Sequence, residues 1–313
     1  MLLPYFGLAV ADILLYLGTY KTCMQLTITG YSTALFSTWY FIDEFGLLFD
    51  AGDGMVASLL QKSRRVNHAF ITHADRDHLT GLLQFNQLNA RPGFPLIYYP
   101  ANCGSFPAFE NFARQFDPQS KGSQWLPLLP DEEIWLRNDI LVRAIKNGHV
   151  PSPEGIFKSC GYKLIQVRKK MKPEFAGCSG AELQRLVEEH GNAFINNEVR
   201  TTLLGYSGDT PVEDYDRWNN CEVLIHEATF LDEKLSGPER ANKHSRLHEV
   251  MEMVSQLNVG KLVLGHFSSR YHPDEIDAAI KNLCEKFAIN IPVYRVLPGQ
   301  TVNNILGQVP VNR

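Results

Sequence analysis

The sequence lacks any paired-cysteine motif. None of its cysteines forms a C-x-x-C pair, which excludes the usual cysteine-based zinc and redox sites. Six cysteines in 313 residues are also too sparse for a disulfide framework. We therefore expect reduced thiols and a cytoplasmic protein. The six are Cys23, Cys103, Cys160, Cys178, Cys221 and Cys284.

An excess of positive charge is also absent. The net charge is −4 and the pI is about 6.2, so the field of the whole molecule does not attract polyanions, and such a partner would need a local patch. The chain has no repeat, low-complexity segment or Ser/Gly-rich linker. With 44% hydrophobic residues it can build a sizeable core, and we expect one domain over residues 24–313.

The N-terminal segment has no Lys or Arg before its apolar run, which reads "MLLPYFGLAVADILLYLGTY". Asp12 interrupts the run, and each half is too short to span a bilayer. We interpret residues 1–23 as an apolar extension that precedes the domain. Stable membrane association is not expected, although export or anchoring through this segment stays open.

Short strands dominate the first half, and strands alternate with helices in the second. Strands are predicted at 24–30, 38–44, 46–52, 68–73, 139–146, 161–169, 201–208, 221–228 and 261–266. A capping box from Ser179 to Glu182 predicts a helix ending at Gly191. Further helices are predicted from Arg246 to Leu257 and from Pro273. This order indicates an α/β fold with two sheets packed face to face and helices outside.

The stretch "FITHADRDHLTG" packs four potential metal ligands into six positions: His73, Asp75, Asp77 and His78. A helix is predicted to follow, with Leu79, Leu82, Leu83 and Leu88 on one face. Divalent metals such as zinc take His nitrogen and carboxylate oxygen.

Four apolar runs each end on such a ligand, at His73, His149, Asp209 and His266. Ligands in α/β proteins collect beyond the carboxyl ends of strands, so this pattern predicts a polynuclear site there. Two metals about 3.5–4 Å apart can clamp both oxygens of a displacement and need a bridging carboxylate. Asp209 is the candidate bridge, and Asp77 could also orient the attacking water.

A set of ordered motifs resembles the metallo-β-lactamase fold and, within it, the tRNase Z branch that removes 3′ trailers from precursor tRNA. The motifs are "DAGDGMVASLL", "FITHADRDHLTGLL", "NGHVPSPEGIFKSCGYKL", "YSGDTP", "LIHEATF" and "LVLGHFSSRY". The resemblance implies an αββα sandwich of two mixed sheets flanked by helices, with a two-zinc site.

The resemblance also implies a role for each residue of the site. One metal would be held by His73, Asp75 and His149, the other by Asp77, His78 and His266, with Asp209 as the bridge. Glu227 of "HEATF" and His244 of "KHSR" would together protonate the leaving oxygen.

Asp75 departs from the family, which has a second His there. A carboxylate is a harder donor and shifts preference toward manganese or iron, although zinc remains the first expectation. Because Asp is short, we expect Asp75 to reach its metal poorly.

Three further departures concern the substrate. The loop at 29–41 lacks the family's Pro and Arg-Asn residues, "HSR" replaces "HST", and the tRNA-gripping arm between His149 and Asp209 is shorter and lacks a Gly-Pro-rich tip. That segment still carries cations that can hold phosphates: Lys163, Arg168, Lys169, Lys170 and Lys172.

Three functions follow from these residues. The first is tRNA 3′-trailer cleavage by a metal-bound hydroxide, with precursor tRNA as partner. A phosphodiesterase acting on a small substrate such as a cyclic nucleotide is the second, favoured by the short arm and the acidic pI. The third is a degenerate, non-catalytic member that binds RNA. Because the family commonly forms dimers, the resemblance implies a homodimer. No feature of the sequence itself predicts one.

Overall fold

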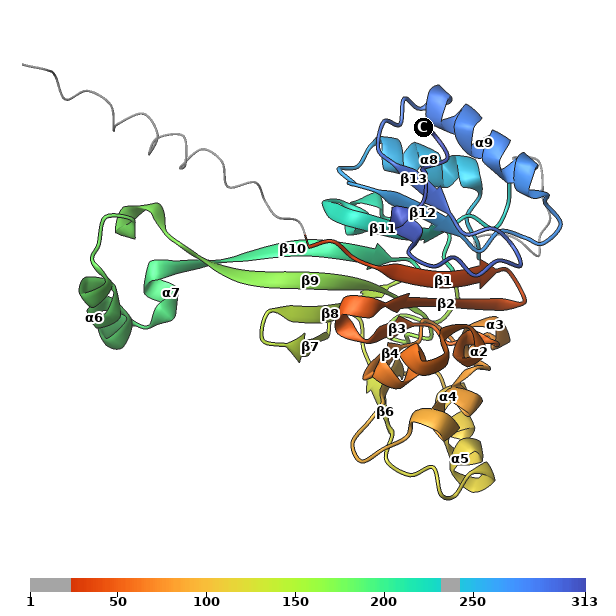
Figure 1. Ribbon diagram of the computed structural model, residues 1–313, viewed down its shortest axis with the longest axis horizontal. Coiled ribbons are helices and arrows are strands. Elements are labelled where there is room, and N and C mark those ends of the chain that lie inside the picture. The colour runs from red at the N-terminus through yellow and green to blue at the C-terminus, as the bar shows by residue number, and fades with distance from the viewer. Residues whose placement is uncertain (1–23, 232–242) are drawn as a thin grey trace, which may run out of the picture.

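Two β-sheets pack face to face in the computed structural model, which describes residues 24–231 and 243–313. One sheet has six strands and the other seven, and helices cover their outer faces (Figure 1). The predicted αββα sandwich is confirmed. The apolar extension predicted at 1–23 lies outside the described residues. Among the helices of the described residues, none is long and apolar enough to cross a membrane.

The first sheet keeps its strands in chain order, antiparallel from β1 to β3 and parallel from β3 to β6. Its strands are β1 (Ile28–Thr33), β2 (Ser37–Ile42), β3 (Leu47–Phe49), β4 (His68–Phe70), β5 (Leu96–Pro100) and β6 (Gln124–Leu128). The helices that follow or link them are α2 (Met55–Leu59), α3 (Arg76–Leu79), α4 (Leu82–Asn89) and α5 (Ser105–Phe116), with 3₁₀ turns η1 (Asp43–Phe45) and η2 (Leu60–Arg65).

The second sheet also runs in chain order, antiparallel from β7 to β10 and parallel from β10 to β13. Its strands are β7 (Glu133–Arg137), β8 (Ile140–Lys146), β9 (Cys160–Met171), β10 (Asn196–Tyr206), β11 (Cys221–Glu227), β12 (Leu262–Gly265) and β13 (Val293–Arg295). Helices α8 (Leu247–Ser255) and α9 (Pro273–Lys286) lie on its outer face (Figure 1). The 3₁₀ turns η4 (Tyr215–Trp218) and η6 (Ile305–Gly307) complete this half.

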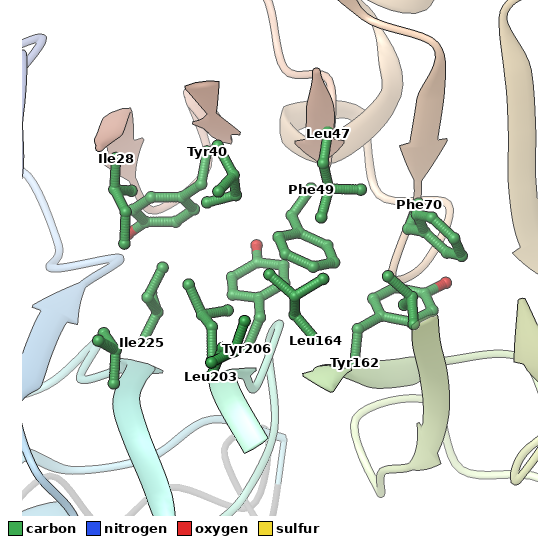
Figure 2. Close-up of a cluster of buried hydrophobic side chains, with 14 of the residues drawn as sticks. Ile28, Tyr40, Leu47, Phe49, Phe70, Tyr162, Leu164, Leu203, Tyr206 and Ile225 are labelled. Atoms are coloured by element: carbon green, nitrogen blue, oxygen red, sulfur yellow. The ribbon is translucent and has the colours of Figure 1, made fainter. Parts of the chain in front are cut away.

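Aromatic and aliphatic side chains fill the space between the sheets (Figure 2). Phe49 of the first sheet stacks on Tyr162 of the second, with ring centroids 5.8 Å apart. Tyr40 meets Tyr206 edge to face at 5.4 Å. All four are buried. Such pairs add to the burial of apolar area, so this layer fixes how the sheets, and therefore their strand ends, are placed.

The segment between β9 and β10 projects from the body as an arm (Figure 1). The two strands continue past their neighbours and carry η3 (Pro173–Phe175), α6 (Gly180–His190) and α7 (Asn192–Ile195) at the far end. The Ser179–Glu182 capping box and the end of α6 at Gly191 are confirmed. The segment extends well beyond the sheet (Figure 1), and that it is shorter than the arm of the family stays a prediction from the sequence.

One predicted helix face is wrong. The single helix expected after the ligand cluster is split into α3 and α4. Leu79 and Leu82 are buried, but Leu88 is 42% exposed and Phe85 takes the inward position. Because the chain is not one continuous helix, residues before and after the break are rotated relative to each other. The spacing of the leucines in the sequence therefore does not place them on one helix face.

Candidate metal centre

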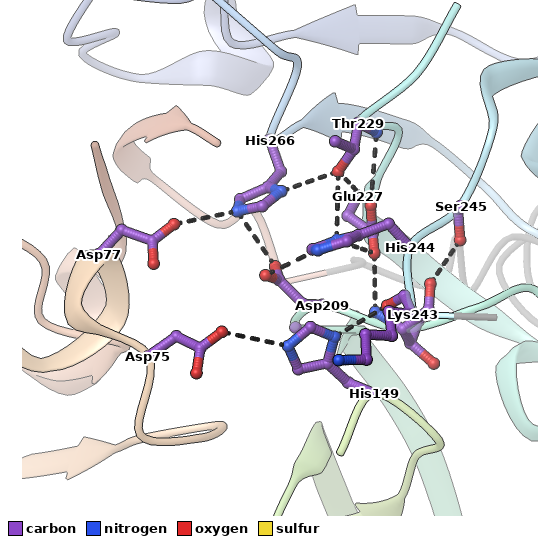
Figure 3. A network of polar contacts seen from close by, with 12 residues as sticks. Asp75, Asp77, His149, Asp209, Glu227, Thr229, Lys243, His244, Ser245 and His266 are labelled. Atoms are coloured by element: carbon purple, nitrogen blue, oxygen red, sulfur yellow. Dashed lines mark hydrogen bonds and ion pairs between the residues drawn. The ribbon is translucent and has the colours of Figure 1, made fainter. Parts of the chain in front are cut away.

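The ends of four strands converge on one site. His73 follows β4, His149 follows β8, Asp209 follows β10 and His266 follows β12. All four side chains are buried, and three of them are labelled in Figure 3. The two sheets bring them together because the four strands end at the same edge of the sandwich (Figure 1), as the pattern of apolar runs predicts.

The first group of donors is His73, Asp75 and His149. Asp75 Oδ2 lies 3.6 Å from His73 Nε2 and 3.5 Å from His149 Nε2. Both imidazoles are buried, whereas the Asp75 side chain is 61% exposed. The Asp75 carboxylate comes as close to each imidazole as the donors elsewhere in the site come to one another. The expectation that it reaches its metal poorly stays a prediction.

The second group is Asp77, His78 and His266, and all three are buried. Asp77 Oδ2 lies 3.4 Å from His266 Nε2 and 3.6 Å from His78 Nε2. The two imidazole Nε2 atoms are 3.4 Å apart. This group therefore forms a closed triangle of donors beneath the surface.

Asp209 lies between the two groups (Figure 3). Its Oδ2 is 3.6 Å from His73 Nε2 in the first group and 3.3 Å from His78 Nε2 in the second. Its Oδ1 is 3.3 Å from His266 Nε2. One carboxylate therefore faces both groups, the position that the sequence pattern predicts for a bridge.

The spacing of the donors fits a shared cation. Two donors about 2.1 Å from one tetrahedral ion are about 3.4 Å apart, and the distances within both groups lie between 3.4 and 3.6 Å. His73 Nε2 is buried and has no hydrogen-bond partner among the described residues. A buried nitrogen left unpaired in this way is costly unless a ligand takes its lone pair.

Hydrogen bonds at the Nδ1 atoms of the imidazoles orient the rings so that their Nε2 atoms can bind a cation. His149 Nδ1 lies 2.8 Å from the carbonyl oxygen of Lys243, and His78 Nδ1 lies 2.8 Å from Asp50 Oδ2. Because both partners only accept, each Nδ1 carries the proton and each Nε2 presents a lone pair. Metal-binding histidines are oriented in this way by their outer contacts.

Hydroxyls give the other two imidazoles the same orientation. The Thr229 hydroxyl donates to Glu227, so it accepts from His266 Nδ1 at 2.9 Å. The Thr72 hydroxyl donates to Asp50, so it accepts from His73 Nδ1 at 2.9 Å. All four histidines therefore direct an unprotonated Nε2 into the site when a cation is present.

Asp50 is a residue that the sequence analysis did not assign to the site. It is fully buried after β3, where it accepts from the Thr72 amide at 2.7 Å and from the Tyr206 hydroxyl. It also orients His78. The available signal was its place in "LLFDAG", an apolar run that ends on a potential ligand as the other four runs do, but nothing local shows which side chains Asp50 meets.

The charges of the donors are strongly coupled. The neighbouring imidazoles of His149 and His73 hold the pKa of Asp75 well below its usual range. Burial lowers the pKa of His73. Burial opposes charge on His78 as well, but Asp209 and Asp50 raise its pKa well above the usual value. A cation bound there would displace that proton, so its affinity falls as the pH falls.

Glu227 and His244 form a pair beside the bridge (Figure 3). His244 Nδ1 lies 3.1 Å from Glu227 Oε1 and 3.8 Å from Asp209 Oδ2. The Glu227 carboxylate is buried and accepts from the Thr210 amide at 2.8 Å. Burial opposes charge on His244, but Glu227 raises its pKa to about 9. A partly exposed imidazole that is protonated at neutral pH can serve as an acid.

Solved structures with the same arrangement have the metallo-β-lactamase fold. The metallo-β-lactamase fold protein YhfI of Bacillus subtilis matches with a TM-score of 0.60 and 14% identity, over 89% of this chain and 99% of that chain. The short form of human tRNase Z matches with a TM-score of 0.56 and 16% identity, over 89% and 99%. Yeast PDE1 matches with a TM-score of 0.52 and 12% identity, over 89% and 100%. The fold of this chain is therefore the metallo-β-lactamase fold, and its donor groups are ones that could hold metal ions.

The chain is similar in sequence to proteins named tRNase Z and ribonuclease Z. It is 29% identical over 275 residues to the chloroplastic tRNase Z TRZ2 of Arabidopsis thaliana, covering 84% of this chain and 73% of that protein. It is 27% identical over 259 residues to ribonuclease Z of Methanocaldococcus jannaschii, covering 73% and 78%. No protein-family model matches the chain.

Proposed function

We propose that this protein is a metal-dependent endoribonuclease that removes 3′ trailers from precursor tRNA. The observation that carries the proposal is the pair of donor groups sharing Asp209, with the Glu227–His244 pair 3.1 Å apart beside them. Such an arrangement can stabilise charge on a phosphodiester and protonate its leaving oxygen. The tRNase Z relatives supply the substrate class.

The two groups would hold two divalent cations. His73, Asp75 and His149 would bind one, Asp77, His78 and His266 the other, and Asp209 would contact both. Each group supplies two imidazoles and one carboxylate, a donor set that zinc accepts. In the first group, the Asp75 carboxylate stands where the family has a His and makes manganese or iron more favourable than that His would. When bound, such cations supply Lewis-acid stabilisation of phosphate charge and an activated water.

The chain's own residues would position and protonate the reacting atoms. Asp77 Oδ2 accepts from the Leu35 amide at 3.0 Å, which fixes the carboxylate that would orient the attacking water. His244, kept protonated by Glu227, would donate a proton to the 3′ oxygen as it leaves. Glu227 would balance the charge of the imidazolium, and its amide and hydroxyl contacts hold it in place.

The arm favours a long substrate. β10 has 11 residues and therefore spans about 35 Å, with Asp209 just past one end and the arm at the other. Arg168 and Lys170 lie opposite Val199 and Asn197 in the strand pairing, so these four positions on one face of the arm carry two cations and no acid. A nucleic acid could contact both this face and the metal centre, whereas a cyclic nucleotide could not.

The proposal is tested with purified protein reconstituted separately with zinc and manganese. Its cleavage of a precursor tRNA with a 3′ trailer is compared with hydrolysis of a small chromogenic phosphodiester. Asp209→Ala should reduce trailer cleavage by at least about 10³-fold and lower the metal content. Glu252→Gln, which alters an exposed acid on α8, is the matched control.

Hydrolysis of the small ester without trailer cleavage would replace the proposal with the small-substrate alternative. Full activity of Asp209→Ala with full metal content would contradict the shared-carboxylate arrangement. Less than one metal per chain and no activity would favour the non-catalytic alternative. Light scattering on the active protein tests the predicted homodimer.

A further inference from the structure

The turn between β1 and β2 has an unusual residue at its strained position. The Phe36 amide donates to the Thr33 carbonyl oxygen at 3.1 Å, which closes a four-residue turn. Leu35, the third residue, has φ 71, and Ala34 before it does not have a positive φ. This is the type II pattern, in which Gly or Asn usually takes the third position. A leucine there is strained.

The same two residues also expose apolar side chains. Leu35 is 88% exposed and Phe36 is 61% exposed. Among the described residues, Leu35 is the most exposed large hydrophobic side chain. A glycine or asparagine at position 35 would remove both the strain and the exposed leucine side chain. Local rules broken together in this way are most often found at functional sites.

The turn is tied directly to the second donor group. The Leu35 amide donates to Asp77 Oδ2 at 3.0 Å. The Ala34 amide donates to the carbonyl oxygen of Phe267, the residue after His266, at 3.3 Å. Figure 1 shows the β1–β2 turn and α3, which carries Asp77, at the same end of the sandwich. The exposed Leu35 and Phe36 side chains therefore stand at the edge of the metal centre.

We propose that Leu35 and Phe36 form an apolar platform on which one unpaired base of the RNA stacks, next to the phosphodiester to be cut. The inference rests on the proposed function and names a specificity contact for it. Every base has an apolar face that stacks on an aromatic side chain, and a base held there would orient the adjoining phosphodiester. Two side chains are too small a surface for a stable contact between two copies of the chain.

The first test uses a trailer-bearing RNA with either a normal base or an abasic nucleotide next to the cleavage site. Stacking predicts that the abasic substrate lowers kcat/KM of the unaltered protein about 5- to 100-fold. Phe36→Ala should lower kcat/KM on the normal substrate by a similar factor and lose most of the difference between the two RNAs. Phe36→Trp should retain it.

Leu35→Gly separates contact from folding. Glycine accepts the positive φ and keeps the amide that Asp77 needs, so the turn should form at least as readily. We expect this variant to discriminate less between the two RNAs without losing thermal stability. Leu60→Gly is the matched control, because Leu60 is also a leucine with a positive φ that is 70% exposed, at the junction of α2 and η2.

A fluorescent base analogue, 2-aminopurine, at the same position provides a readout that needs no catalysis. Metal-free protein should quench its fluorescence on binding RNA, and Phe36→Ala should not. Equal discrimination and equal quenching by Phe36→Ala and the unaltered protein would overturn the platform while leaving the proposed function intact. Absence of trailer cleavage by the unaltered protein would overturn the proposed function, and the quenching would still decide the platform. A change in oligomeric state in Phe36→Ala would instead assign the surface to contact between copies.

Discussion

The two donor groups of the metal centre are built differently. In the second group, Asp77, His78 and His266 are all buried, and each is held from outside by Leu35, Asp50 or Thr229. In the first group, both imidazoles are buried but the Asp75 side chain is 61% exposed. Within the part of the chain that the structure describes, the Asp75 carboxylate is held only by the two imidazoles of its own group.

This difference indicates which part of the site is structural and which is open to substrate. A fully buried and braced group loses little freedom when it binds a cation, so it should bind tightly. The exposed carboxylate of Asp75 lies on the side of the site that is open to solvent, where the proposed substrate would approach. The first group should therefore exchange its cation more readily, and the identity of residue 75 should set which cation that is.

After loss of the shared Asp209, the largest expected effect comes from the Glu227–His244 pair. Glu227→Gln should lower kcat by about 10²-fold or more while leaving the metal content unchanged. His244 acts as an acid only while protonated, so activity should fall as the pH rises through about 9. Removing the Glu227 charge removes the main cause that raises that pKa, with Asp209 still present, and the alkaline fall should move to lower pH. The measurement is a pH–rate profile of both proteins, and an unchanged alkaline limb would contradict the assignment.

Substitution of Asp50 tests whether the hydrogen bond that it accepts from His78 strengthens metal binding by the second group. Asp50→Asn keeps the shape but removes the charge facing His78, and should weaken the tighter metal about 10- to 100-fold. Titration against a metal-binding dye measures this affinity. Asp53→Asn, which changes an exposed acid three residues away, is the control. Equal metal affinities of Asp50→Asn and Asp53→Asn would show that the hydrogen bond between Asp50 and His78 does not make the second group bind more tightly.

Substitution of Asp75 tests the open group alone. Asp75→His should shift the first group from manganese toward zinc by about 10-fold, and Asp75→Ala should leave one tightly bound metal per chain. Metal analysis after dialysis distinguishes these outcomes. Two metals retained by Asp75→Ala would mean that the exposed carboxylate is not a ligand.

The smallest effect is expected on the arm. Replacing Arg168 and Lys170 by alanine should weaken RNA binding a few-fold and reduce the slope of log affinity against log salt by about one for each phosphate that is no longer neutralised. Hydrolysis of a small phosphodiester should not change. Lys169→Ala is the control, because Lys169 lies on the other face of the arm, opposite Glu198. If log affinity falls with log salt at the same slope in all variants, the arm does not contact the RNA phosphates.

Much of the site could be predicted because ligand-bearing residues follow apolar runs. His73, His149, Asp209 and His266 are each recognisable from the run that precedes them. Asp50 follows the same pattern but was not predicted, because its role depends on Thr72, His78 and Tyr206 meeting it across the two sheets. The strained turn at Leu35 could not be predicted either, because the neighbouring residues do not indicate a positive φ at a leucine.

Periodicity and residue chemistry are local properties, and they sufficed to predict the alternation of strands and helices, the donor residues and the strand ends at which these lie. The packing of the two sheets was needed to show that Asp75 reaches both imidazoles, that Asp209 faces both groups, and that an exposed turn borders the metal centre. These features depend on how the sheets meet through their aromatic layer, and no local stretch of sequence encodes the distance between residues far apart in the chain.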